Sequence, residues 1–285
     1  MRKLPVSLGE ITREGIWALR ALGYSYFIAD RATRLVVWTE AVHQTGLKFL
    51  RIGNEQLRKL PKGGPLTTVD ISDNSRLIDG GGRSILELGP PAIDLTTAAS
   101  RKGSFGQSVI WNINGLCLAD ALSEIAISRD LGVILIYRSG MSEIRGSQFS
   151  RSGWLASFRH GENLHTYSSS LNEKTGAYLQ HLSETALDLD KGSVNKLLEN
   201  LNLAKTEKAA EDGYLSISIT PVDQNWLSDV NEKKQGLPEV DYTRRLKKAE
   251  KQGVMADHKD FLNLYSLEYE TWAPTSERSK KQAAF

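Results

Sequence analysis

Residues 107–137, QSVIWNINGLCLADALSEIAISRDLGVILIY, decide the expected fold. Gln107 to Ile113 has the apolar content of a strand, and Gly132 to Tyr137 has the length and branched side chains of a buried strand. Between them, Gly115 to Asp130 carries apolar residues at helical spacing. A helix of this length allows a right-handed crossover between parallel strands of one sheet. The segment therefore predicts a strand, helix, strand unit in an α/β or α+β protein.

Two helices are predicted ahead of this unit. Ser7-Leu8-Gly9-Glu10 is a capping box, and the apolar stripe after it ends near Gly23. A second amphipathic stretch follows from Ser25 to about His43. Because the connection between them is short, the two helices should form an antiparallel hairpin. We expect four of its side chains to be buried: Leu19, Leu22, Leu35 and Val36.

The remaining elements are predicted from local pattern alone. Strands are expected at Leu66 to Ile71 and Arg83 to Leu88, separated by the turn-rich Asp79-Gly80-Gly81-Gly82. Further strands are expected at 154–158, 164–167 and 214–220, and helices at 193–203, 241–252 and 261–272. The expected domains are an N-terminal helical region over 1–60, an α/β core over 61–272 that can divide near 140–150, and a flexible tail over 273–285.

Composition narrows the function classes. The 285 residues include 36 Lys and Arg against 34 Asp and Glu, a net charge of +2, which gives no chain-wide reason to bind nucleic acid or an anionic membrane. Cys117 is the only cysteine, so an intramolecular disulfide is impossible. No apolar window reaches the length of a membrane span, and no signal peptide is present at Met1. We therefore expect a cytoplasmic protein with no nucleic-acid or membrane partner.

Motifs for chemistry are sparse. The five histidines do not have metal-ligand spacing, so no metal is predicted, and neither glycine cluster is a phosphate-binding fingerprint. The loop after the most convincing buried strand offers more, because ligands tend to lie beyond strand ends in α/β sheets. Its arginines and serines suit a carboxylate or a phosphate. The candidates are Arg138, Ser139, Ser142 and Arg145; the alternative is a solvated connection with incidental charge.

Three stretches resemble a known family: Val6 to Ile11 (VSLGEI), Thr39 to Leu47 (TEAVHQTGL) and Leu118 to Val133. They are similar to the type-2 malate/L-lactate/ureidoglycolate dehydrogenases. The resemblance implies a non-Rossmann α/β fold with a mixed sheet, NAD or NADP as cofactor, a small carboxylate metabolite as substrate, and a homodimer. The stretch Tyr269 to Ser279 instead resembles a bacterial family of unknown function that shares the N-terminal helices.

The chain departs from the family at its acid/base. The dehydrogenases carry Ser-His-Gly near the end of the second helix, where this chain has Gln44-Thr45-Gly46. Threonine has no usable pKa near neutrality for proton transfer. A second family histidine, expected in the loop after the buried strand, is also missing.

Two interpretations remain open. In the first, the protein is an NAD(P)-dependent oxidoreductase of a small 2-oxo or 2-hydroxy acid or a cyclic imine. His43 is then the catalytic acid, and Arg138 or Arg145, with Ser139 and Ser142, holds the substrate carboxylate. In the second, it is a non-catalytic homologue that binds a metabolite or a partner subunit. Either way, the pocket should involve residues 138–147 and approach the turn at 43–46.

Overall fold

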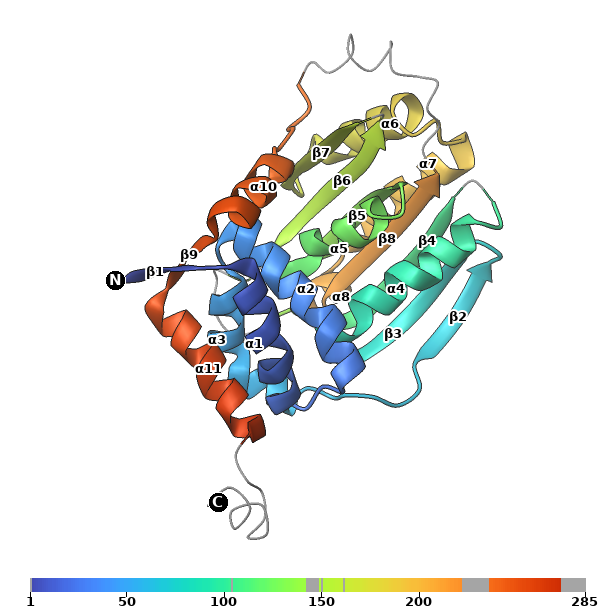
Figure 1. The fold of residues 1–285 in the computed structure, drawn as a ribbon. Helices are drawn as coiled ribbons and strands as arrows, with labels where there is room; N and C mark the ends of the chain where they lie inside the picture. The colour runs from blue at the N-terminus through green and yellow to red at the C-terminus, as the bar shows by residue number, and fades with distance from the viewer. Residues whose placement is uncertain are drawn as a thin grey trace, which may run out of the picture.

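A mixed sheet organises the molecule in the computed structural model, which describes residues 2–103, 105–141, 149, 151–160, 162–221 and 236–272. Its seven strands lie in the order β2-β3-β4-β8-β5-β6-β7 (Figure 1). β3 and β4 are parallel, and the other neighbouring pairs are antiparallel. The strands are β2 (Thr67–Ser72), β3 (Ser75–Ser84), β4 (Gly106–Asn114), β5 (Leu131–Arg138), β6 (Ser152–His160), β7 (Asn163–Ser170) and β8 (Tyr214–Pro221).

The helices cover the sheet from two sides and form a layer beside it (Figure 1). In chain order, the first helices are α1 (Leu8–Ala21), α2 (Tyr26–His43), α3 (Gly46–Lys59), α4 (Ile85–Ser100), the 3-10 helix η1 (Leu116–Ala121) and α5 (Leu122–Ile127). They are followed by α6 (Thr175–Thr185), α7 (Lys191–Ala204), α8 (Glu207–Asp212), α10 (Tyr242–Gln252) and α11 (His258–Trp272). The helices α10 and α11 pack with the first ones, on α2 and α1.

The central strand β5 contributes to two separate cores. Along β5, Val133, Leu135 and Tyr137 join the core that contains α1 to α5, whereas Ile134 and Ile136 join the core that contains α6 and α7. This alternation follows from the period of two residues in a strand. We call the two sides of the sheet the α4 face and the α7 face.

The predicted strand, helix, strand unit is confirmed. β4 and β5 lie in the same sheet, and both run antiparallel to β8, which separates them. They are therefore parallel to each other. The predicted intervening helix is present as η1 followed by α5.

The N-terminal hairpin is also confirmed. Ser7 Oγ accepts a hydrogen bond from the Glu10 backbone N–H at 3.1 Å, as a capping box requires. The four apolar side chains expected inside are at most 2% exposed. The hairpin does not stand alone, because the short strand β1 (Lys3–Val6) pairs with β9 (Val254–Asp257) and α11 packs on α1. The N- and C-terminal parts of the described chain thus build one helical layer.

The predicted strand at Arg83 to Leu88 is wrong. β3 ends at Ser84, whose Oγ accepts from the Leu86 backbone N–H at 3.2 Å and so caps α4. The glycines ahead of it do not form a hairpin turn. The β3–β4 register skips between Asp79 and Arg83, so the glycines form an irregularity within one strand.

Candidate functional site

The corner between α2 and α3 sets the position of His43. A Cβ atom on Gly46 would lie 2.1 Å from the Val36 carbonyl oxygen, so only glycine allows the two helices to approach this closely. Gln44 takes the left-handed conformation that ends α2, with φ of 55°. Glu40 then reaches forward, and its Oε2 accepts from the Leu47 backbone N–H at 3.0 Å. His43 is therefore held on a rigid corner.

Burial perturbs the Glu40 carboxyl. It raises the pKa of Glu40 above its ordinary value of 4.5, although the backbone N–H of Leu47 opposes the shift. Because the folded-state pKa is the higher one, the stabilisation is complete below about pH 4.5 and is lost as the pH rises through the folded-state pKa. As the pH rises through this folded-state pKa, the free energy of unfolding should therefore fall less in Glu40→Gln than in the wild type. Urea unfolding at a series of pH values measures this difference.

Glu40→Met is the matched control for this prediction. It also removes the titrating group, but it leaves the Leu47 N–H without its acceptor. It should therefore be less stable than Glu40→Gln at every pH, by about 1–3 kcal/mol. If the free energy of unfolding of Glu40→Gln depended on pH as steeply as that of the wild type, the prediction would be contradicted.

A buried carboxylate, Asp120, collects the polar groups around His43. Its Oδ2 lies 3.1 Å from His43 Nε2, 3.3 Å from Arg151 Nη1 and 3.4 Å from the Tyr242 hydroxyl. Its Oδ1 accepts from the Tyr137 hydroxyl at 2.7 Å. We call these five residues the Asp120 cluster. The cluster joins segments that are far apart in the chain: the end of α2, η1, β5, the residue before β6, and α10.

The two tyrosines act as hydrogen-bond donors in this cluster. Burial, followed by the nearby Asp120 charge, raises the pKa of Tyr137 well above its ordinary value. The same two causes raise the pKa of Tyr242 to about 12. Both phenols therefore keep their protons at neutral pH and donate them to the carboxylate.

The His43 ring is enclosed by aromatic side chains. Its centroid lies 5.7 Å from that of Trp38 and 5.3 Å from that of Tyr242, both edge to face. The side chain is 10% exposed. His43 lines a pocket of about 580 Å³ between the end of α2, α10 and β9, which we call the His43 pocket. Arg245 and Lys248 of α10 bring two positive charges to the same pocket.

The candidate residues predicted after β5 lie on different sides of the sheet. Arg138 is the residue after Tyr137 in β5, so it points to the α7 face, where its Nη1 donates to the Ala204 carbonyl oxygen at 3.5 Å. It lines a separate pocket of about 490 Å³. Arg138 and His43 therefore line different pockets, and residues 142–148 of the expected pocket loop lie outside the described residues.

Ser139 does connect to the His43 side. Its Oγ accepts from the Arg151 backbone N–H at 2.9 Å, and the Arg151 guanidinium reaches Asp120. Ser142 and Arg145 lie outside the described residues. Their roles, and those of Arg138 and Ser139 in holding substrate, stay predictions.

Sequence reasoning missed the centre of the cluster. Asp120 is a lone acid in the apolar run Leu116 to Leu122, and a carboxylate placed on the buried side of a helix requires partners. This lone buried acid was the feature of the sequence that could have identified the cluster. Nothing local identifies Arg151 or Tyr242 as those partners. Within the described ranges, no three His, Cys, Asp or Glu side chains converge as a metal-ligand group.

The chain has the fold of the malate/lactate dehydrogenase-like proteins, as the comparisons with solved structures show. A dehydrogenase from Sinorhizobium meliloti superposes with a TM-score of 0.67 at 12% identity, over 93% of this chain and 98% of that one. Sulfolactate dehydrogenase from Methanocaldococcus jannaschii gives 0.65 at 15% identity, over 94% and 98%. Δ1-Piperideine-2-carboxylate reductase from Pseudomonas syringae gives 0.62 at 12% identity, over 93% and 99%.

The comparisons of sequence gave a different result from the comparisons of structure. No family model matches the chain, and no curated protein matches it. The similarity is therefore one of fold, and the expected dehydrogenase-like mixed sheet is confirmed. No helix in the part of the chain that the structure describes is both long and apolar enough to cross a bilayer.

Proposed function

We propose that the protein is an NAD(P)-dependent oxidoreductase that reduces a small 2-oxo acid or a cyclic imine carboxylate, or runs the reverse reaction on a 2-hydroxy acid. One observation carries the proposal. The His43 imidazole is hydrogen-bonded to the buried Asp120 carboxylate and lines a pocket that also holds Arg245 and Lys248. The named substrates of the structural neighbours, sulfolactate and piperideine-2-carboxylate, are likewise small carboxylates.

His43 is the proposed acid. Its Nε2 faces Asp120, which leaves Nδ1 to give a proton to the substrate oxygen or imine nitrogen. Asp120 fixes the orientation of the ring, and the donors from Tyr137 and Arg151 fix Asp120 in turn.

The positive side chains are the proposed anion holders. Arg245 donates Nη1 to the Val42 carbonyl oxygen at 3.2 Å, which keeps the guanidinium beside the end of α2. Arg245 and Lys248 are well suited to pair with a substrate carboxylate.

We assign the nicotinamide cofactor to the same pocket on the grounds of the pocket's positive side chains. About 580 Å³ is within the range of roughly 300–1,000 Å³ that is usual for ligand sites. Neither Arg245 nor Lys248 forms an ion pair with a described residue, so both charges are available to a phosphate as well as a carboxylate. When bound, the cofactor would supply the hydride.

A non-catalytic binding protein is the second candidate. It is favoured by the enclosure of the Asp120 cluster, since the Asp120 side chain is only 3% exposed and both of its oxygens already accept hydrogen bonds. Such a fully satisfied network can serve stability alone. In addition, Thr45 stands where the resembled family has its catalytic histidine.

Cofactor binding separates the two candidates. NADH and NADPH are titrated separately into the purified protein, and energy transfer from tryptophan to nicotinamide is followed. Trp38 lies against His43 and is one of six tryptophans, so Trp38→Phe should reduce the transfer while leaving binding measurable by calorimetry. Micromolar binding with this Trp38 dependence supports the oxidoreductase. No binding of either cofactor supports the binding protein.

His43→Ala tests the proposed acid directly. Loss of a general acid should lower kcat/KM by about a hundredfold or more. The variant should still fold, because Asp120 keeps three other donors, with a melting temperature lowered by the loss of the ring between Trp38 and Tyr242. Arg34→Ala, at an exposed position of α2 that does not line the His43 pocket, is the control and should keep activity. Equal activity in His43→Ala would end its role as acid, and absence of wild-type turnover on a panel of 2-oxo acids and cyclic imines would favour the binding protein.

A further inference from the structure

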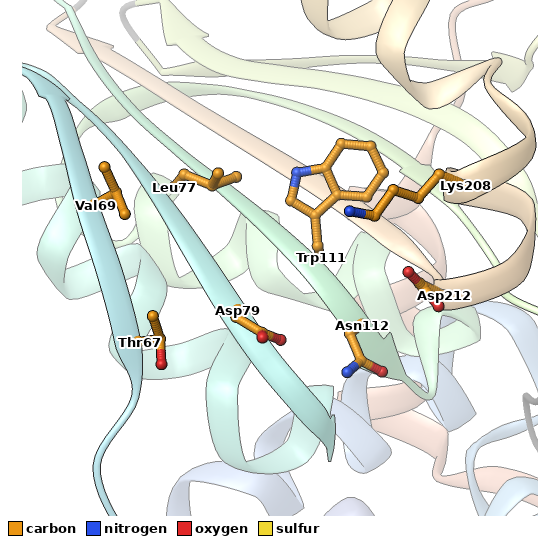
Figure 2. A pocket seen from close by; sticks show the side chains of 8 residues that line it. All are labelled: Thr67, Val69, Leu77, Asp79, Trp111, Asn112, Lys208 and Asp212. Atoms are coloured by element: carbon orange, nitrogen blue, oxygen red, sulfur yellow. The ribbon is translucent and has the colours of Figure 1, made fainter.

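A separate pocket lies on the α7 face, near the edge of the sheet that β2 forms. Figure 2 shows its side chains, which come from β2, β3, β4 and α8. Its volume is about 330 Å³. It is on the opposite side of the sheet from the main core that contains the His43 corner, and no residue lines both pockets. The two pockets are therefore distinct sites.

Strand register arranges the floor of this pocket in two rows. Val69 pairs with Leu77 across β2 and β3, which makes an apolar row. In the next row, Thr67 pairs with Asp79, and Asp79 pairs with Trp111. An apolar strip and a polar aromatic strip thus lie side by side (Figure 2).

Helix α8 supplies the wall, and its end is fixed against β4. The Asn112 backbone N–H donates to the Gly213 carbonyl oxygen at 3.1 Å. A Cβ atom on Gly213 would lie 2.2 Å from the Ile113 carbonyl oxygen, so this contact requires glycine. Asn112 itself has a φ of 53°, a strained conformation for a residue with a side chain. The close approach places Lys208 and Asp212, one turn apart, at the mouth of the pocket.

The charges of the pocket favour a cation. Lys208 Nζ lies 5.6 Å from the centroid of the Trp111 ring, so the Lys208 ammonium group already makes a cation–π contact with the indole. Asp212 has no hydrogen-bond or ion-pair partner among the described residues. Asp79 uses Oδ1 to accept from the Gly81 N–H, which leaves Oδ2. Two carboxylates and one ammonium sum to −1, which repels anions.

We propose that this pocket binds an organic amine with an apolar body. The ligand ammonium lies against Trp111 between Asp79 and Asp212, and its apolar part covers the Val69–Leu77 row. Lys208 is the internal cation that the ligand displaces from the indole. One positive charge from the ligand neutralises the pocket, which a neutral or anionic ligand does not do.

Phenethylamine and its neutral analogue 2-phenylethanol are the probes, titrated by calorimetry into the full chain. The amine should bind at least about tenfold more tightly than the alcohol, as expected for a cation on an indole beside carboxylates. Asp212→Asn should weaken amine binding about tenfold. Lys208→Gln should strengthen it about threefold or more, because the competing cation is gone. His43→Ala should leave it unchanged.

Several results would overturn the proposal. Equal binding of the amine and the alcohol would reduce the pocket to an apolar cleft. Weaker binding in Lys208→Gln would make Lys208 a ligand-holding donor, and the site one for anions or polyols. No binding of phenethylamine to wild type or Lys208→Gln would remove the site. The melting temperatures of both surface variants, measured alongside, show that each is folded.

Discussion

Gly46→Ala is expected to lower the melting temperature by roughly 10 °C or to prevent folding. The new methyl group would lie 2.1 Å from the Val36 carbonyl oxygen and 2.9 Å from the Glu40 nitrogen. Both are backbone atoms, so the helices themselves must separate, at a cost of about 3 kcal/mol or more. For a chain of this size, each kcal/mol shifts the melting temperature by roughly 2–4 °C. Thermal unfolding followed by circular dichroism measures the change.

Gly9→Ala is the matched control. Gly9 lies in the first turn of α1, where a Cβ atom would meet no other atom within 4 Å, and alanine is the better helix former. It should be neutral or stabilising by about 0.5–1 kcal/mol. A Gly46→Ala protein that melts within roughly 2 °C of the wild type, the shift expected from about 1 kcal/mol, would show that the corner can relax. If the prediction holds, packing alone explains why a glycine follows Thr45.

Asp120→Ala should also be strongly destabilising, with a loss of about 3–5 kcal/mol in the free energy of unfolding. The Tyr137 hydroxyl is buried and would lose its acceptor, and the Arg151 guanidinium would lose its carboxylate. His43 would lose the group that orients its ring, so any turnover should fall with it. Chemical denaturation and steady-state kinetics measure the two effects.

Two further variants serve as comparisons for Asp120→Ala: one keeps the shape of the Asp120 side chain without its charge, and the other removes a carboxylate nearer the surface. Asp120→Asn keeps an acceptor oxygen for Tyr137 and should be less destabilised than Asp120→Ala. Asp94→Ala removes a half-exposed carboxylate that pairs with Arg31 and Arg129, and should cost about 1 kcal/mol or less. A similar small loss in Asp120→Ala would show that the Asp120 cluster adds little stability.

Local signals explain what could be predicted from the sequence. The cap at Ser7 and the apolar stripes on α1 and α2 are each contained within a few turns of helix, so the hairpin was predictable. The buried strand β5 was equally clear from its own residues. The apolar residues of Ile85 to Leu88 indicated a strand, but the Ser84 cap and the packing of α4 on the sheet favour a helix there.

The site depended on information that no local window contains. Tyr137 and Arg138 are neighbours in the chain, and only the placement of β5 between two cores shows that they serve opposite faces. His43 and Asp120 are 77 positions apart, and Tyr242 lies 122 positions beyond Asp120. A single sequence shows a lone acid and a lone histidine, but it does not show that they meet.

The pairing of β1 with β9 has a consequence for how the protein is made. Residues 3–6 pair with residues 254–257, and α1 packs on α11, which follows those residues in the chain. During synthesis, which proceeds from the N-terminus at about 5–20 residues per second, the first helices leave the ribosome well before these partners exist. The part of α1 that α11 covers must stay exposed, or be held by a chaperone, until residues 254–272 emerge. The helical layer therefore closes after translation of the sheet and not ahead of it.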